Sequence, residues 1–282
     1  MKIREINSDL ITQTVVQMCI EANCYIDSKI KAALEKSITC EKSEVGKGIL
    51  KNLLKNAEIA ADKEIPICQD TGMAVFFIEI GKDVHITGKN LTDAVNDGVR
   101  EGYIKGYLRK SVVRDPLMRE NTGDNTPAVI YTEQTDGDKV KITYAPKGFG
   151  SENKSALKML NPSDGVEGII DFVTETVRKA GANPCPPMVV GVGIGGTMDK
   201  AAYLAKRALV RDIDKPNAVD FYAKLEKTLL ERINMLGIGP QGMGGITTAL
   251  AVNIEVFPTH IAGLPAAVNI NCHATRHAVR VI

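Results

Sequence analysis

Cys68, Gln69 and Asp70 place a thiol, an amide and a carboxylate side by side in one short segment. Pro66 disfavours helical geometry before it and Gly72 permits a sharp turn after it, so the three side chains are expected in a loop. The apolar run 73–80 follows directly, as a buried strand would. Such a loop is typical of a reaction centre, and the alternative is a buried thiol beside an Asx turn.

Two more cysteines stand where a loop meets a strand. Cys185 lies between prolines in 183–187, where no helix can form, and Cys272 ends the apolar alternation of Val268 and Ile270. The three cysteines are 117 and 87 residues apart, unlike local ferredoxin runs or paired C-x-x-C zinc sites. Only folding can bring them together, and a site with three thiolates is therefore a hypothesis at this point.

The remaining cysteines have simpler interpretations. Cys19 belongs to a helical apolar pattern and is expected to be a core thiol, and Cys24 and Cys40 receive the same interpretation. Six cysteines in 282 residues do not make a disulfide scaffold. The N-terminus shows no signal-type apolar segment, so a reducing compartment, the cytoplasm, is predicted.

Composition excludes several classes of protein. The chain is 44% hydrophobic and 24% charged with a formal net charge of +1, which is ordinary for a globular protein. Basic residues alternate with acidic ones and tryptophan is absent, so nucleic-acid binding is not expected. No apolar run approaches the roughly 20 residues of a membrane span. A membrane protein is therefore not expected either.

The hydrophobic patterns predict an α/β fold with helices packed around a mixed β-sheet. Helices are expected near residues 8–36, 44–61, 90–108, 164–181, 198–209 and 217–236. Strands are expected at 73–80, 140–144, 188–194, 250–256 and before Cys272. No repeat or low-complexity linker is visible. We expect a single large catalytic domain over residues 1–282, including a helical N-terminal segment of about 1–62.

The motifs, taken together, resemble the α subunit of class I fumarate hydratase, in the iron–sulfur fumarase and tartrate dehydratase family. They keep the family order and extend from about residue 65 to the C-terminus. The residues that carry the resemblance are Ile67–Gly72, Gly106–Arg109 with Ser111–Val113, Lys147–Lys154, Asn183–Pro187, Gly193–Thr197 and Ile238–Gly242.

The resemblance implies a [4Fe–4S] cluster with three cysteine ligands, which would be Cys68, Cys185 and Cys272. One iron would then be open to a substrate hydroxyl and carboxylate, as a Lewis acid. Asp70 matches the residue that exchanges a proton with the departing or attacking oxygen, and Gln69 would hydrogen-bond substrate. Without the resemblance, Asp70 would be taken as a turn cap.

The resemblance also implies substrate contacts elsewhere in the chain. Arg109 would hold a carboxylate with its planar guanidinium, and His260 matches a histidine that contacts substrate, in a catalytic role. Gly148 and Gly150 would let the backbone N–H groups of 147–150 form a nest for a carboxylate. Without the resemblance, Arg109 would be interpreted as a surface charge and His260 as a core or surface histidine. Residues 147–150 would be interpreted as a loop that opens a helix.

Single-chain members of the family continue into a further domain that completes the pocket. The resemblance therefore implies a separate β subunit, a hetero-oligomer, and a small dicarboxylate substrate. The general base is left unassigned because the partner can supply it. The contexts of Arg109 and of Ser151–Lys154 favour reversible hydration of fumarate to malate, with the α subunit of L-tartrate dehydratase as the alternative.

Two rival interpretations stay open. The run Gly191–Gly196 follows an apolar strand and fits the G-x-G-x-x-G pattern of a dinucleotide-binding protein, or else permits close packing. His273 and His277 stand at i, i+4 beside Cys272, which on a helix would suit a zinc-stabilised binding module. The latter lacks the glutamate of H-E-x-x-H.

Overall fold

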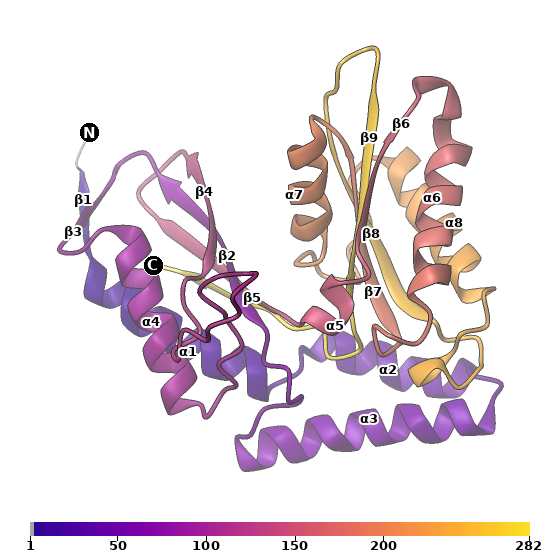
Figure 1. Cartoon of the computed structure of the whole chain (residues 1–282), viewed down its shortest axis with the longest axis horizontal. Coiled ribbons are helices and arrows are strands. Elements are labelled where there is room, and N and C mark those ends of the chain that lie inside the picture. The colour runs from indigo at the N-terminus through magenta and orange to yellow at the C-terminus, as the bar shows by residue number, and fades with distance from the viewer. Residues whose placement is uncertain (1–2) are drawn as a thin grey trace. The chain divides into compact units, whose positions relative to one another are not determined.

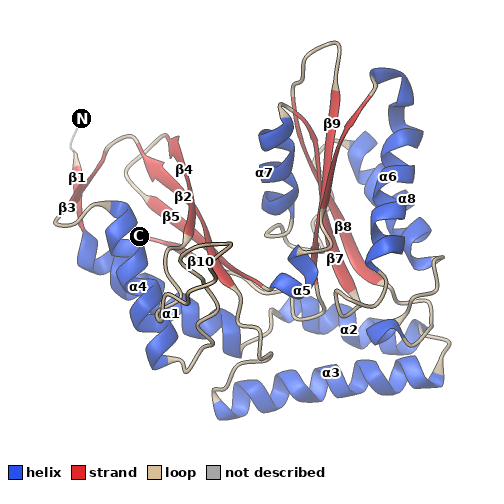
Figure 2. Cartoon of the chain, viewed as in Figure 1, coloured by secondary structure: helices blue, strands red, loops and turns tan. Residues whose placement is uncertain are grey.

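The computed structural model describes residues 3–282, and residues 1 and 2 of the predicted domain lie outside that range. Contacts divide the chain into two compact units. Unit 1 comprises residues up to Ile26, Ala57–Gly148 and Arg276–Ile282, and unit 2 comprises Asp27–Asn56 and Phe149–Thr275. Helices and mixed sheets occur in both, which confirms the α/β class (Figure 2). The extent of one catalytic domain over the whole chain stays a prediction.

Unit 1 is built on a four-stranded mixed sheet in the order β10-β5-β2-β4. Strand β2 runs parallel to β4 and antiparallel to β5, and β10 is antiparallel to β5. A parallel pair of short strands, β1 and β3, forms a second sheet. The elements are β1 (Arg4–Asn7), α1 (Ser8–Cys24), β2 (Met73–Gly81), β3 (Val84–Thr87), α4 (Leu91–Lys105), β4 (Val129–Thr135), β5 (Val140–Lys147) and β10 (Ala278–Val281).

The core of unit 1 lies between this sheet and the pair α1 and α4. Alternate residues of β2, such as Phe76 and Ile78, pack with Tyr144 of β5 against Val15 of α1 and Val99 of α4. All are essentially buried. Because a strand presents every second side chain to the same face, this arrangement fixes the register of β2 and thus where Cys68–Gly72 enters the sheet.

Unit 2 has its own four-stranded mixed sheet, in the order β6-β9-β7-β8. Strand β7 is parallel to β8 and antiparallel to β9, and β6 is antiparallel to β9. The elements are α2 (Ser28–Cys40), α5 (Phe149–Glu152), β6 (Ala156–Leu160), α6 (Gly165–Ala180), β7 (Met188–Gly195), α7 (Met198–Ala208), α8 (Asp220–Asn234), β8 (Ala249–Phe257) and β9 (Leu264–Asn271), with short 3₁₀ turns at Pro162–Asp164 and Pro240–Gly242. Helix α3 (Glu44–Lys63) contains the boundary between Asn56 and Ala57.

Helices cover both faces of the unit 2 sheet (Figure 1). Helices α6 and α8 pack their apolar sides on one face, and α7 packs on the other through Ala201 and Ala205 against Ala267 of β9. The approach of α7 is close because Gly193 lies beneath it: a Cβ there would lie 2.1 Å from the carbonyl oxygen of Ala201. Burial on both faces explains why β7 is a continuous apolar run.

Two predictions for the N-terminal part of the chain are wrong. The expected helix over 8–36 is two helices, because Tyr25 is extended and the Asp27 side chain caps α2 by accepting a hydrogen bond from the Lys29 N–H at 2.8 Å. Cys40 is not a core thiol but is exposed at the end of α2. Among residues 3–282, no helix combines the length and the apolar character that crossing a membrane requires.

Candidate active site

The Cys68–Gly72 segment lies in unit 1, between α3 and β2, as predicted. Cys68 and Asp70 are half-buried and Gln69 is exposed. The N–H of Gly72 donates to Asp70 Oδ1 at 3.1 Å, so the aspartate closes an Asx turn. This contact occupies one carboxylate oxygen with a backbone donor and orients the other.

Gly72 is required by the close approach of β5. Its φ is +78°, and a Cβ there would lie 2.7 Å from the backbone nitrogen of Lys147, the residue paired with Met73. Next to Lys147, a Cβ on Gly148 would lie 3.2 Å from Asp70 Oδ2. The fold therefore brings together two of the predicted site residues, Asp70 and Gly148.

Arg109 is joined to the same segment through Thr71. The N–H of Arg109 donates to Thr71 Oγ1 at 2.9 Å, and this hydroxyl lies 3.2 Å from the Arg109 carbonyl oxygen. Asn125, which is fully buried, donates from Nδ2 to the Gly72 carbonyl at 3.2 Å and accepts from the Ser111 N–H at 2.7 Å. Thr71 and Asn125 thus hold the Arg109 segment beside Asp70, and the sequence interpretation gave neither of them a role.

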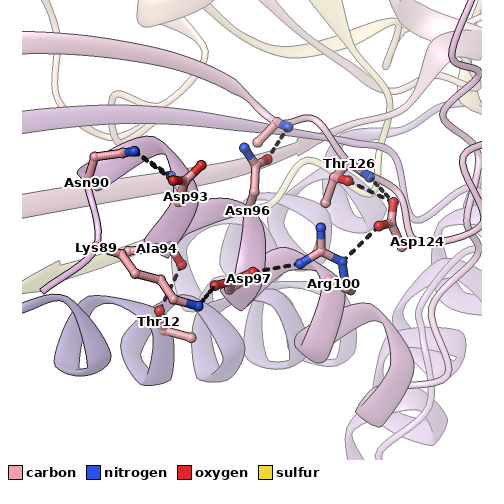
Figure 3. Close-up of polar contacts among 11 residues, drawn as sticks. Thr12, Lys89, Asn90, Asp93, Ala94, Asn96, Asp97, Arg100, Asp124 and Thr126 are labelled. Carbon is pink, nitrogen blue, oxygen red and sulfur yellow. Dashed lines mark hydrogen bonds and ion pairs between the residues drawn. The ribbon is translucent and has the colours of Figure 1, made fainter.

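A surface network on α4 fixes the loop that carries Asn125 (Figure 3). Arg100 donates to Asp97 at 2.6 Å and to Asp124 at 2.8 Å, and Asp124 accepts from the Thr126 N–H at 3.0 Å. Burial raises the pKa of Asp124, but the hydrogen bonds from Arg100 and Thr126 outweigh it and lower the pKa to about 2. The loop is therefore anchored by an ionised carboxylate at neutral pH.

Arg276 is a further site residue that the sequence interpretation missed. It is 6% exposed and donates from a guanidinium nitrogen to the Asp70 carbonyl oxygen at 2.7 Å. The hydroxyl of Tyr103 lies 3.0 Å from the carbonyl oxygens of both Thr71 and Gly72 in the same segment, and burial raises the pKa of this phenol. The sequence signal that could have identified Arg276 is its position four residues after Cys272.

Cys185 and Cys272 lie together at one end of the unit 2 sheet. Cys185 precedes β7 and Cys272 follows β9, and these strands pair antiparallel with Val189 opposite Asn271. The N–H of His273 donates to the Cys185 carbonyl oxygen at 3.2 Å. Cys185 is exposed with a φ of +54°, and Cys272 is half-buried. Two of the three predicted ligands are thus brought to one place by strand pairing.

Gln241 connects the two strand ends in unit 2. Its N–H and its Nε2 both donate to the Pro186 carbonyl oxygen at 2.8 Å, and Nε2 lies 3.1 Å from His273 Nδ1. Gly150 is close as well, since a Cβ there would lie 3.8 Å from the Asn183 carbonyl oxygen. Neither Gly150 nor Gly148 has a positive φ, and the substrate-binding role expected of their backbone N–H groups stays a prediction.

His260 lies away from these cysteines. It is exposed and follows β8, whose parallel pairing with β7 ends at Phe257 opposite Gly195. The eight residues of β7 put roughly 25 Å between that end of the sheet and the end that carries Cys185. His260 instead lines a cavity of about 370 Å³ with apolar residues such as Phe221. The catalytic and substrate-binding role of His260 stays a prediction. Its position at the opposite end of the unit 2 sheet from Cys185 and Cys272 does not support that role.

The other cysteines differ sharply in environment. Cys19 and Cys24 are fully buried, as predicted, and burial raises the pKa of Cys19 to about 12. None of the six cysteines, all within the described residues, forms a disulfide. The solvent-accessible thiols of Cys68, Cys185 and Cys272 are therefore better suited to bind iron than these buried ones.

The premises of both rival interpretations are wrong. Gly191 and Gly193 lie inside β7, where they make room for α7, and not in a turn after the strand. Residues 272–277 form a loop between β9 and β10, so His273 and His277 share no helical face. Close packing explains the glycines, and a zinc module loses its geometric basis.

Three thiols are the predicted ligands of an iron–sulfur group, those of Cys68, Cys185 and Cys272. Among residues 3–282, no group of three or more His, Cys, Asp or Glu side chains is arranged to hold a metal. The three-cysteine ligand set therefore stays a prediction. Soft thiolates are the ligands such clusters use.

The fold defines an α/β protein in which Cys68 and Asp70 precede β2, Cys185 precedes β7 and Cys272 follows β9. A family model for fumarate hydratase (Fumerase) matches residues 12–281, and the chain belongs to this family.

Named relatives match almost end to end. The chain is 45% identical to the "Putative L(+)-tartrate dehydratase subunit alpha" of Methanocaldococcus jannaschii, covering 96% of this chain and 97% of the relative. It is 32% identical to the L(+)-tartrate dehydratase subunit alpha of Escherichia coli O157:H7, covering 96% and 90%.

Proposed function

We propose that this chain is the α subunit of an iron–sulfur hydro-lyase that adds water to, or removes it from, a four-carbon dicarboxylate. The observation that carries the proposal is the grouping of Asp70 with Gly148, Thr71-bound Arg109 and Arg276 beside Cys68 in unit 1. Family membership and the subunit names of the relatives support it.

The proposed cofactor is a [4Fe–4S] cluster bound by Cys68, Cys185 and Cys272. Pairing of β7 with β9 supports the second and third of these ligands. When bound, the cluster would supply an open iron as a Lewis acid for the substrate hydroxyl. The thiols must stay reduced, and the cytoplasm is therefore the proposed compartment.

The chain's own residues bind the substrate and move a proton. Arg109 has a planar guanidinium that suits a substrate carboxylate, and Gln69 is exposed beside Cys68 to hydrogen-bond the substrate. Asp70 would transfer a proton at the departing or attacking oxygen. The Gly72 N–H donates to Oδ1 and so fixes the orientation of this carboxylate. The base for the carbon-bound proton is left unassigned, because a β subunit, which the relatives' subunit names suggest, can supply it.

Two substrates are candidates. Fumarate, hydrated to malate, is supported by the family description and by the sequence around Arg109. L-tartrate is supported by the names of the relatives. Anaerobic co-expression with the β chain, followed by assays on both substrates, decides between them. A cluster-loaded complex inactive on both rules out this pair, and colourless protein with stoichiometric zinc rules out the iron–sulfur proposal.

A further inference from the structure

Glu41 is a buried carboxylate that the proposed chemistry does not use. It follows α2 and is 2% exposed. Its Oε1 accepts from the N–H groups of Lys42 at 2.8 Å and Ser43 at 3.0 Å, in its own turn. It also accepts from the N–H groups of Ile246 at 3.1 Å and Thr247 at 2.9 Å, about two hundred residues away. A buried carboxylate with this many N–H donors is held strongly in place, and it in turn fixes the two backbone segments that donate to it.

The far partners of Glu41 belong to a compact loop, residues 238–248. The loop closes on itself through the Gly244 N–H to the Ile238 carbonyl at 2.9 Å and the Gly239 N–H to Thr248 Oγ1 at 3.2 Å. Gly245 lies against the carboxylate, since a Cβ there would be 2.7 Å from Glu41 Oε1. The loop has little regular structure, so these contacts determine its position.

Gln241 stands at the tip of this loop and contacts both strand ends that carry cysteines. It donates twice to the Pro186 carbonyl, next to Cys185, and lies 3.1 Å from His273 Nδ1, next to Cys272. Its φ of +51° is unfavourable for a side chain other than glycine or asparagine, so surrounding contacts must impose it.

We propose that Glu41 is a positioning residue: by anchoring loop 238–248 it holds Gln241 between Pro186 and His273 and so fixes Cys185 and Cys272 relative to each other. The proposal rests on the proposed function only where it treats Cys185 and Cys272 as cluster ligands. The positioning of loop 238–248 by Glu41 does not depend on any cofactor.

The test compares Glu41→Gln with a matched control, Glu226→Gln, in the full chain. Glu226 is also a buried glutamate of unit 2, 6% exposed, that accepts from the backbone N–H groups of Asn217 at 2.9 Å and Ile254 at 2.8 Å, and it also pairs with the Arg211 guanidinium. It has no contact with loop 238–248 among its hydrogen bonds. Both variants keep the side-chain volume and remove a buried charge, so they separate general destabilisation from the specific role.

Hydrogen–deuterium exchange is the first readout. Glu41→Gln should speed exchange about tenfold or more in 238–248 and at the His273 amide, with less than about twofold change in α6. Glu226→Gln should leave 238–248 within about twofold of wild type. Unchanged exchange in 238–248 on Glu41→Gln, or acceleration as large in α6, overturns the proposal.

A milder variant covers the case in which Glu41→Gln does not fold. Thr247→Val removes the hydroxyl that also hydrogen-bonds the Glu41 carboxylate. It should speed exchange in the same segment about threefold, and no change there overturns the proposal.

The second readout is cluster retention in the anaerobic complex with the β chain. Under a chelator, the visible absorption of Glu41→Gln should bleach about five times faster than that of wild type and of Glu226→Gln. Equal bleaching in all three overturns the link from Glu41 to the thiols. A wild-type complex without a cluster refutes the proposed function, and the exchange experiment then still decides the role of Glu41.

Discussion

Asp70 closes a turn, and one substitution can separate this structural role from the proton transfer proposed for it. An asparagine there keeps an oxygen that accepts from the Gly72 N–H, now at 3.1 Å, but cannot exchange a proton. Asp70→Asn should therefore lower kcat by about 10²- to 10⁴-fold while leaving the melting temperature nearly unchanged. Asp115→Asn is the control, since Asp115 closes a similar turn by accepting from Leu117 and Met118. Equal activity in both variants would remove Asp70 from the mechanism.

The proposed ligand set makes a second prediction for single residues. Cys185→Ser should abolish the brown colour and reduce iron to a small fraction of wild type, because serine is a poor ligand for a cluster. Cys40→Ser, at an exposed cysteine on α2 in the same unit, should keep both. Iron content and visible absorption of the anaerobic complex are the measurements. Intact cluster content in Cys185→Ser would contradict the three-ligand assignment.

At the scale of the element, two glycines should respond to alanine with opposite signs. Gly193→Ala would push a Cβ to 2.1 Å from the Ala201 carbonyl and 2.5 Å from the Ala205 nitrogen, both backbone atoms of α7. It should destabilise the chain by about 2–3 kcal/mol. Gly48 in α3 has no atom within 4 Å of such a Cβ, so Gly48→Ala should stabilise by about 0.5–1 kcal/mol. Urea unfolding measures both, and equal effects would refute the packing role of Gly193.

Elements could be predicted from sequence where a local signal decides them. The apolar runs at 73–80 and 188–194 became β2 and β7, because strands buried on both faces need continuous apolar residues. The break at Tyr25–Asp27 was missed because the apolar spacing continues through Ile26 and Ile30 across it. The short strands β1 and β10 pair with residues far along the chain, at Val84 and Tyr144, and no local pattern specifies such partners.

At the scale of the whole molecule, the two units share a strand order that the sequence does not reveal as a repeat. In unit 1, β2 pairs parallel with β4 and antiparallel with β5; in unit 2, β7 does the same with β8 and β9. Cys68 precedes β2 and Cys185 precedes β7, the strand with the same pairings in the other unit. The family motifs identified these thiols, whereas Arg276 and Gln241 required the strand pairings and loop contacts that only folding supplies.

The response of the whole chain to acid provides the last prediction. Burial raises the pKa of Glu41, but the hydrogen bonds from Ser43, Ile246 and Thr247 outweigh it and lower the pKa to about 2. A folded-state pKa below the unfolded value of about 4.5 means that this carboxylate stabilises the fold at neutral pH, by about 3 kcal/mol.

Most of that stabilisation should be lost as the pH falls from about 4.5 to about 2, because the folded state then has to take up the proton. Asp124 and Asp212, whose pKa values are also lowered to about 2, should add to the loss over a similar range. Urea unfolding of wild type and Glu41→Gln at pH 7, 4 and 2.5 measures it. Wild type should be more stable at pH 7 and the difference should shrink toward pH 2.5; a difference independent of pH would show that the Glu41 charge does not stabilise the fold.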